Sequence, residues 1–137
     1  MRSGHLNNYR CIKGRGASEE RRIQIRVLVA FEYEYRVYGA AITGAVRRAR
    51  PTDEVVVTAE IGVLERQVRS FAPHLIISSL PAPTNWGEWF SWVRLSSDPN
   101  RPSEICVEGK RRESLNPNLG ELLCVLEEIE GLLVESD

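Results

Sequence analysis

The sequence predicts an α/β domain built on a mostly parallel sheet. Three runs of β-branched and apolar residues, at 23–31, 54–59 and 74–79, have the pattern of strands buried on both faces. Two stretches with helical spacing of apolar residues separate these runs, which gives the order β-α-β-α-β. This order requires right-handed crossovers and a parallel sheet.

The size and charge of the chain fit one folded domain. Its 137 residues suffice for one core and are too few for two ordinary domains. We expect this domain to span 23–137 and a basic, mobile tail to occupy 1–22. The net charge of −1 argues against a nucleic-acid partner, and the absence of a long apolar run argues against a membrane span.

The cysteines predict a cytoplasmic protein with reduced thiols. Cys11, Cys106 and Cys124 are an odd number without C-x-x-C spacing, and two of them are expected in the core. Neither His5 nor His74 lies at ligand spacing from them, so neither a metal site nor a cofactor is predicted. The N-terminal segment also has no apolar stretch typical of a signal peptide.

Two helices are predicted in the first half. The first covers 35–50 and is stopped by Pro51, and the second covers 60–72 before Pro73. The expected buried face of the first consists of Val37, Ala41, Ile42, Ala45, Val46 and Ala49. That of the second consists of Ile61, Leu64, Val68 and Phe71.

The second half is less regular. Segments 92–97 and 104–109 have the composition of two short strands, but the link "DPNRP" is too short for a parallel crossover. They form an antiparallel edge, or one of them is not a strand. Asn118 is predicted as the N-cap of a last helix, with Glu121 three residues on. The apolar seam of that helix, which fits either the core or a homodimer face, consists of Leu119, Leu122, Leu126, Ile129 and Leu133.

Five segments between residues 26 and 133 resemble the receiver domain of bacterial response regulators. They are "VLVAFE", "VVVTAEIGVLERQVRSFAPHLIISSLP", "WVRLSS", "VEGK" and "NLGELLCVLEEI". The resemblance implies a flavodoxin-like, doubly wound, mostly parallel five-stranded sheet. It also implies that the third and fourth helices of the family are shortened or missing here.

The resemblance further implies a receiver pocket whose chemistry is degenerate. The acidic pair falls on Phe31 and Glu32, and the phosphoacceptor position falls on Ser79, or on Ser78 if the register slips by one. Ser96 fits the hydroxyl position and Lys110 the lysine position, although Arg111 follows where the family usually has proline. One carboxylate cannot hold a divalent ion as three can, and Glu32 would pair with Lys110 instead.

The predicted function is therefore a non-phosphorylatable, receiver-like signalling module that is not an enzyme and acts by binding a protein partner. Two alternatives remain open. One is a sensor of a small molecule or anion at the strand-end pocket. The other is a receiver phosphorylated at a non-standard acceptor.

Two aromatic groups also allow two interpretations each. Trp86, Trp89 and Trp92 form either an interaction patch or a plug over a sheet face that lacks a helix. The aromatic residues after the first strand either line a ligand pocket or fill a former metal site; they are Phe31, Tyr33, Tyr35 and Tyr38.

Overall fold

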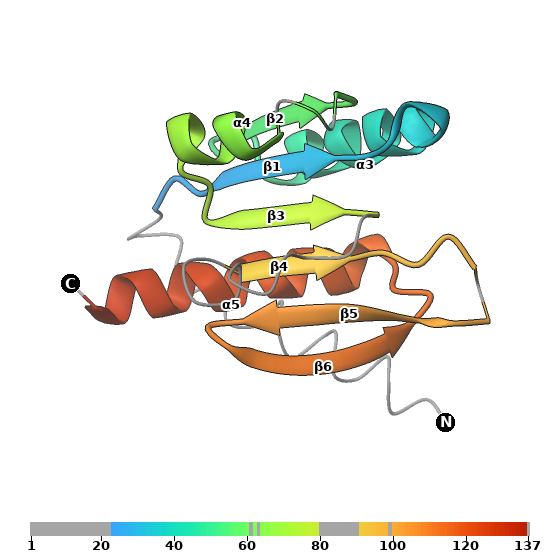
Figure 1. Cartoon of the computed structure of the whole chain (residues 1–137). Coiled ribbons are helices and arrows are strands. Elements are labelled where there is room, and N and C mark those ends of the chain that lie inside the picture. The colour runs from blue at the N-terminus through green and yellow to red at the C-terminus, as the bar shows by residue number, and fades with distance from the viewer. Residues whose placement is uncertain (1–22, 61, 63, 80–90, 99, 137) are drawn as a thin grey trace.

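The computed structural model describes residues 23–60, 62, 64–79, 91–98 and 100–136, and within them it contains one six-stranded sheet and three α-helices (Figure 1). The elements in chain order are β1 (Arg26–Ala30), the 3-10 turn η2 (Tyr33–Tyr35), α3 (Arg36–Ala49), β2 (Glu54–Thr58), α4 (Leu64–Phe71), β3 (Leu75–Ser78), β4 (Ser91–Arg94), β5 (Pro102–Val107), β6 (Lys110–Leu115) and α5 (Leu119–Ser136). The predicted α/β class is thus confirmed. The predicted tail at 1–22 lies outside the described residues.

Four neighbouring strands form the parallel part of the sheet, in the order β2-β1-β3-β4. The chain leaves β1 through α3 to reach β2 on one side, and returns through α4 to β3 on the other side of β1. The carboxyl ends of β1 and β3 therefore flank the point at which the strand order reverses. In open α/β sheets this is the point where ligands usually bind.

The remaining two strands are antiparallel, which confirms the antiparallel edge, one of the two alternatives for 92–97 and 104–109. The sheet has six strands and is partly antiparallel, which corrects the five-stranded, mostly parallel sheet that the receiver resemblance implies. β5 pairs antiparallel with β4, and β6 pairs antiparallel with β5. The short link after β4 accounts for the first reversal, because a parallel connection needs about a dozen residues. Glu108 and Gly109, both at positive φ, form the two-residue turn that makes the second.

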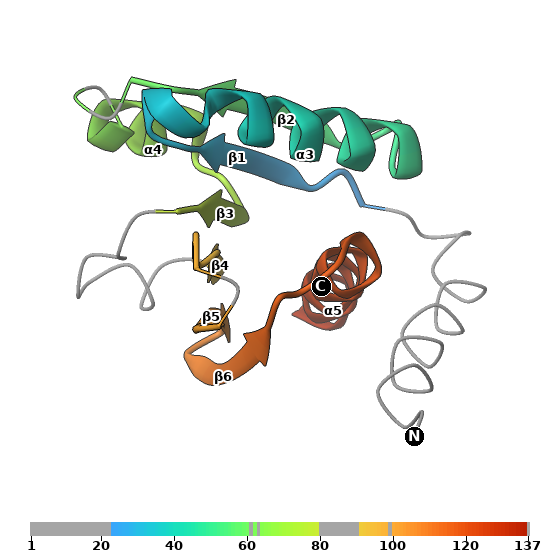
Figure 2. The same ribbon diagram turned by 90° about the vertical axis from the view of Figure 1, so that its right-hand side faces the viewer.

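The sheet is covered on both faces. One core contains the buried side chains of α3 and α5 together with Val27, Val29 and Ile77 of the sheet. Figure 2 shows α5 alongside the strands of the second half, and α3 beside β1. The second core, on the opposite face, contains Leu64 of α4 with Ile76. Cys106 and Cys124 are both buried and outside any disulfide, as predicted for two of the three cysteines.

The predicted helix faces are confirmed only in part. In α3 the buried residues are Gly39, Ile42, Thr43 and Val46, whereas Val37 is 75% exposed. In α4 Leu64 is buried, with Val68 and Phe71 packed against the same core. The seam of α5 lies in the core at Leu122, Leu126 and Ile129, while Leu119 is 39% exposed. Asn118 caps α5 as predicted, since its Oδ1 accepts a hydrogen bond from the Glu121 N–H over 2.9 Å.

A buried ionic cluster joins distant parts of the chain at the amino-terminal edge of the sheet. Arg50, which follows α3, contacts Asp53 through Nε and donates from Nη2 to Glu130 Oε1 over 2.9 Å. The two carboxylates also accept backbone hydrogen bonds, Asp53 from Ile25 and Glu130 from Ile23. Burial alone would lower the pKa of Arg50, but the hydrogen bonds and charges of both carboxylates raise it above its ordinary value.

Within the described residues no helix combines the length and the apolar character needed to cross a membrane.

Candidate functional site

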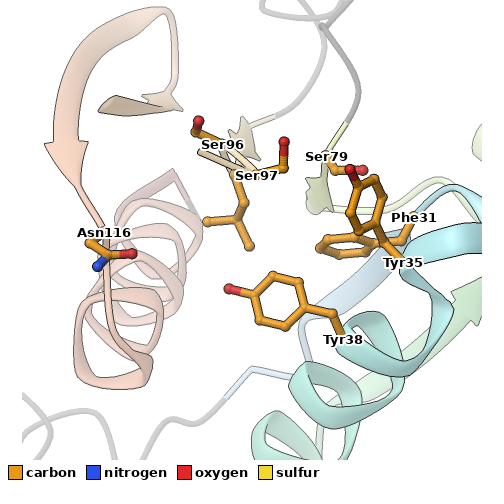
Figure 3. A pocket seen from close by; sticks show the side chains of 8 residues that line it. Phe31, Tyr35, Tyr38, Ser79, Ser96, Ser97 and Asn116 are labelled. Atoms are coloured by element: carbon orange, nitrogen blue, oxygen red, sulfur yellow. The ribbon is translucent and has the colours of Figure 1, made fainter. Parts of the chain in front are cut away.

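A hollow of about 200 Å³ opens at the carboxyl ends of β1, β3 and β4, beside the point where the strand order reverses. We call it the strand-end pocket. Figure 3 shows the lining side chains around this space, with Tyr38 and Asn116 on opposite sides of it. Its described lining consists of Phe31, Tyr35, Tyr38, Ser79, Leu95, Ser96, Ser97 and Asn116.

The aromatic wall of the pocket is built by the chain between β1 and α3. Phe31 is buried directly after β1, and its ring meets the ring of Tyr38 edge-on at a centroid distance of 5.5 Å. Gly39 lets α3 approach this ring, because a Cβ at residue 39 would lie 3.0 Å from Phe31 Cδ1. The absence of a side chain at residue 39 therefore sets the position of the aromatic wall.

The polar groups of the pocket converge from separate segments. Ser79 follows β3, Ser96 and Ser97 follow β4, and Asn116 follows β6. Asn116 adopts φ of +57°, a left-handed conformation that asparagine tolerates better than most residues. The Oγ of Ser79 is shielded from solvent and has no hydrogen-bond partner among the described residues. All eight described lining side chains are uncharged, so the pocket offers hydroxyl and amide groups between apolar walls.

A second hollow, of about 360 Å³, adjoins the strand-end pocket. The two share Ser79, Leu95, Ser96 and Ser97, and the second is also lined by Arg94, Asp98 and Arg101. We call it the arginine hollow. Two arginines against one aspartate give its described lining a formal charge of +1.

Of the residues predicted for the receiver pocket, three line the strand-end pocket, namely Phe31, Ser79 and Ser96. Ser78 is buried in β3, within the sheet, and is 1% exposed. Glu32 follows Phe31 but is absent from the described lining of both hollows. The structure thus brings Phe31, Ser79 and Ser96 together in the strand-end pocket, and the predicted carboxylate of Glu32 is not part of its described lining.

Lys110 lies elsewhere, which corrects the predicted pairing with Glu32. It begins β6 opposite Val107, at the edge of the sheet where β4 begins and the parallel strands start. The physical reason is the reversal of β5, which carries the segment "VEGK" away from the carboxyl ends of the parallel strands (Figure 1). At the carboxyl ends of the parallel strands, the residue that follows β6, Asn116, lines the strand-end pocket instead.

Of the two interpretations of the tryptophans, an interaction patch or a plug over the sheet, the one described member supports the plug. Trp92 is 3% exposed and packs with Ile76 and Cys106 in the second core. The guanidinium of Arg111 lies 5.5 Å from the centroid of its ring. Trp92 therefore contributes to the covering of the sheet, while Trp86 and Trp89 lie outside the described residues.

Several lining residues carry no signal that marks them in the sequence. Tyr35 and Tyr38 are foreseen by the aromatic run after β1, whereas Leu95 and Ser97 are ordinary residues at a strand end. Arg94 lies at the carboxyl end of the parallel strand β4, whereas Arg101 and Asn116 reach the site only because β5 and β6 turn back. The asparagine-proline pair at 116–117 signals a turn, which is the feature that could have indicated Asn116.

Comparisons with family models, with curated proteins and with solved structures return no match for this chain. Among the described residues, no group of three histidine, cysteine, aspartate or glutamate side chains is arranged to hold a metal ion. The resemblance to receiver domains accordingly stays a prediction from the sequence.

Proposed function

We propose that this domain is a non-catalytic regulatory module that binds a small organic ligand in the strand-end pocket. The observation that carries the proposal is the lining of the pocket, where aromatic walls surround hydroxyl and amide groups from separate segments. Ligand sites are typically concave and mainly apolar, with a few polar groups that fix orientation. The place of the pocket at the reversal of strand order favours the same function.

The Oγ of Ser79 supports a ligand in particular. A buried polar group without a partner costs about 1–3 kcal/mol of folding free energy. A ligand group that forms a hydrogen bond with Ser79 Oγ would recover part of this cost as binding free energy. A hydroxyl, carbonyl or amide of a ligand would supply that partner once the Ser79 side chain turns toward the pocket. Tyr38, from the opposite wall, presents its phenol toward the same space (Figure 3).

The second candidate is a receiver-like signalling module that acts through a protein partner. It is favoured by three exposed apolar side chains around the start of α3, because such groups mark interaction sites when they are contiguous. Tyr33, Val37 and Tyr38 are 65%, 75% and 51% exposed. Tyr38 belongs to both this patch and the pocket, so a bound ligand would change the surface that a partner meets.

The first test is an NMR titration with fragment-sized aromatic alcohols and amides. We expect the amide signals of Tyr38, Ser79 and Asn116 to shift together as a fragment binds. Tyr38→Ala should weaken binding about tenfold, corresponding to the loss of one aromatic wall. Tyr33→Ala is the matched control, because Tyr33 is also exposed but does not line the pocket.

Shifts confined to residues outside the pocket, or equal effects of the two substitutions, would contradict the ligand-binding proposal. The second candidate is tested with Val37→Ser, which changes the patch and not the pocket lining. This variant should keep fragment binding and lose association with a signalling partner that co-purifies with the wild-type domain. Retained association would remove the patch from the proposal.

A further inference from the structure

The strand-end pocket and the arginine hollow are two compartments of one site. They share four lining residues at the ends of β3 and β4, yet they differ in chemistry. The first is aromatic and uncharged, whereas the second contains two guanidinium groups. A ligand long enough to reach past Ser79 and Ser96 would contact both.

We infer that the ligand of this site is an aromatic phosphate ester, with its ring in the strand-end pocket and its phosphate in the arginine hollow. This inference rests on the proposed function and names the class of ligand. Aromatic rings prefer edge-on or offset contacts with other rings, which Tyr35, Tyr38 and Phe31 offer. Arginine binds phosphate through parallel N–H groups, and the exposed hydroxyl of Ser97 can donate to a remaining oxygen, whereas that of Ser96 already donates to the Asp98 carbonyl over 3.0 Å.

Arg101 is available to such an anion. Its side chain is 80% exposed, and its Nε lies 3.9 Å from Asp98 Oδ2, a distance longer than a hydrogen bond. Surface ion pairs of this kind contribute about 0–1 kcal/mol, so a phosphate can compete with the carboxylate. Asp98 Oδ1 also accepts a hydrogen bond from the Asn100 N–H, which holds this carboxylate within its own loop.

Arg94 is positioned by a different contact. Its Nε donates to Glu104 Oε1 over 3.3 Å, and the two side chains are 28% and 32% exposed. This contact uses Nε alone, and Glu104 is not part of the described lining of the hollow. Among the described residues the terminal amino groups of Arg94 make no hydrogen bond, and the contact with Glu104 on the neighbouring strand keeps the side chain in place.

The test compares phenyl phosphate with its two halves, phenol and inorganic phosphate, by NMR titration of the full chain. We expect phenyl phosphate to shift signals of both compartments and to bind about tenfold more tightly than either half. Raising sodium chloride from about 50 mM to about 500 mM should weaken phenyl phosphate and leave phenol unchanged, since salt screens exposed charges.

Arg101→Gln should raise the Kd of phenyl phosphate about five- to tenfold without changing that of phenol. Because Arg101 is exposed, the variant should fold normally. Arg69→Gln is the matched control, since Arg69 is an exposed arginine of α4 that lines neither hollow. An Arg94→Gln variant provides a second, independent loss of affinity.

The outcomes separate this inference from the proposed function. If phenol binds as tightly as phenyl phosphate in the strand-end pocket, the inference fails and the proposed function stands. If phosphate alone binds as tightly as phenyl phosphate, the aromatic compartment is not used and the inference fails. If no probe shifts any pocket signal, the inference fails, and the fragment titration alone then decides the proposed function.

Discussion

Arg50 donates a hydrogen bond from Nη2 to Oε1 of Glu130 over 2.9 Å, across 80 positions of the sequence. Both side chains are buried, with 7% and 3% exposure. The contact joins the turn after α3 to the last helix. Glu130 also accepts a hydrogen bond from the backbone N–H of Ile23. One carboxylate of α5 therefore binds both the start of the described chain and the turn after α3.

Replacing this carboxylate should destabilise the whole domain. We expect Glu130→Gln to lower the free energy of unfolding by about 3 kcal/mol, because it leaves a buried guanidinium short of one charged partner. Urea denaturation followed by circular dichroism measures the change. Glu128→Gln is the control in the same helix, since Glu128 pairs with Arg112 at the surface, and it should cost less than about 1 kcal/mol. Equal losses for the two variants would contradict a structural role of the buried cluster.

His74 should make stability depend on pH. Its Nδ1 accepts the backbone N–H of Arg26 over 2.9 Å, which requires the neutral ring. Burial, with the positive charge of Arg26, lowers the pKa of His74, while Asp53 opposes the shift. The unfolded chain therefore takes up a proton near pH 6.5, before the folded chain does. The stability that the neutral ring contributes is present above about pH 6.5 and is lost as the pH falls through the lower folded value.

Urea titrations at about pH 7.5 and about pH 5.5 measure this loss, because ordinary carboxylates remain mostly ionised over that interval. His74→Asn places an amide oxygen near the position of Nδ1 and does not titrate, so its stability should change less between the two pH values. His5 is present in both proteins and serves as an internal control. The same pH dependence in wild type and variant would exclude His74 as its source.

Gly39 and Gly44, both in α3, should respond to alanine in opposite directions. At residue 39 the new methyl group would meet Phe31 at 3.0 Å, so the ring has to move, at a cost of about 1–3 kcal/mol. At residue 44 the nearest atom is the end of the flexible Arg48 side chain, 3.6 Å away, and alanine should stabilise the helix by up to about 1 kcal/mol. Thermal unfolding measures both effects. NMR should show displaced ring signals of Phe31 and Tyr38 in Gly39→Ala alone, and stabilisation by both substitutions would disprove the contact.

After treatment with acetyl phosphate and Mg²⁺ and removal of both, the amide spectrum should be unchanged at Glu32, Ser79 and Ser96, because reversible phosphate binding is reversed and no covalent group remains. A phosphate ester at Ser79 requires a base that removes the proton from Oγ. Asp98 is the one carboxylate in the described lining, and it contacts Asn100 and Arg101 instead. Intact-protein mass spectrometry provides the second measurement. A phosphoryl group found on Ser78 or Ser79 would support a receiver with a non-standard acceptor.

The first half of the fold could be predicted because its strands are apolar on both faces. Residues 75–78 are buried throughout. In an α/β domain, a short apolar run of this kind is typical of a central parallel strand covered on both faces. β2 has the same composition, but it lies at the edge of the sheet, where Val57 is 42% exposed. Composition therefore predicts a strand without predicting its neighbours.

The last strand could not be predicted because its residues are polar on both sides. The sequence "KRRESL" of β6 has five exposed positions and one half-buried position, and it shows no alternation of apolar side chains. Backbone pairing with β5, and not burial, holds it in the sheet. The location of Lys110 depends on this pairing, so a resemblance based on the order of elements placed it at the wrong edge.

The hairpin of β5 and β6 reverses the chain twice, so the chain leaves β6 at the same edge of the sheet at which it left β4. One reversal takes the backbone from the carboxyl edge of the parallel strands to the opposite edge, and a second returns it, so α5 starts where it would start after a single parallel strand. An even number of reversals thus starts α5 at the carboxyl edge and brings the residue after β6, Asn116, to the strand-end pocket. Loss of either strand alone would send α5 across the sheet in the opposite direction, so the position of the last helix requires both strands together.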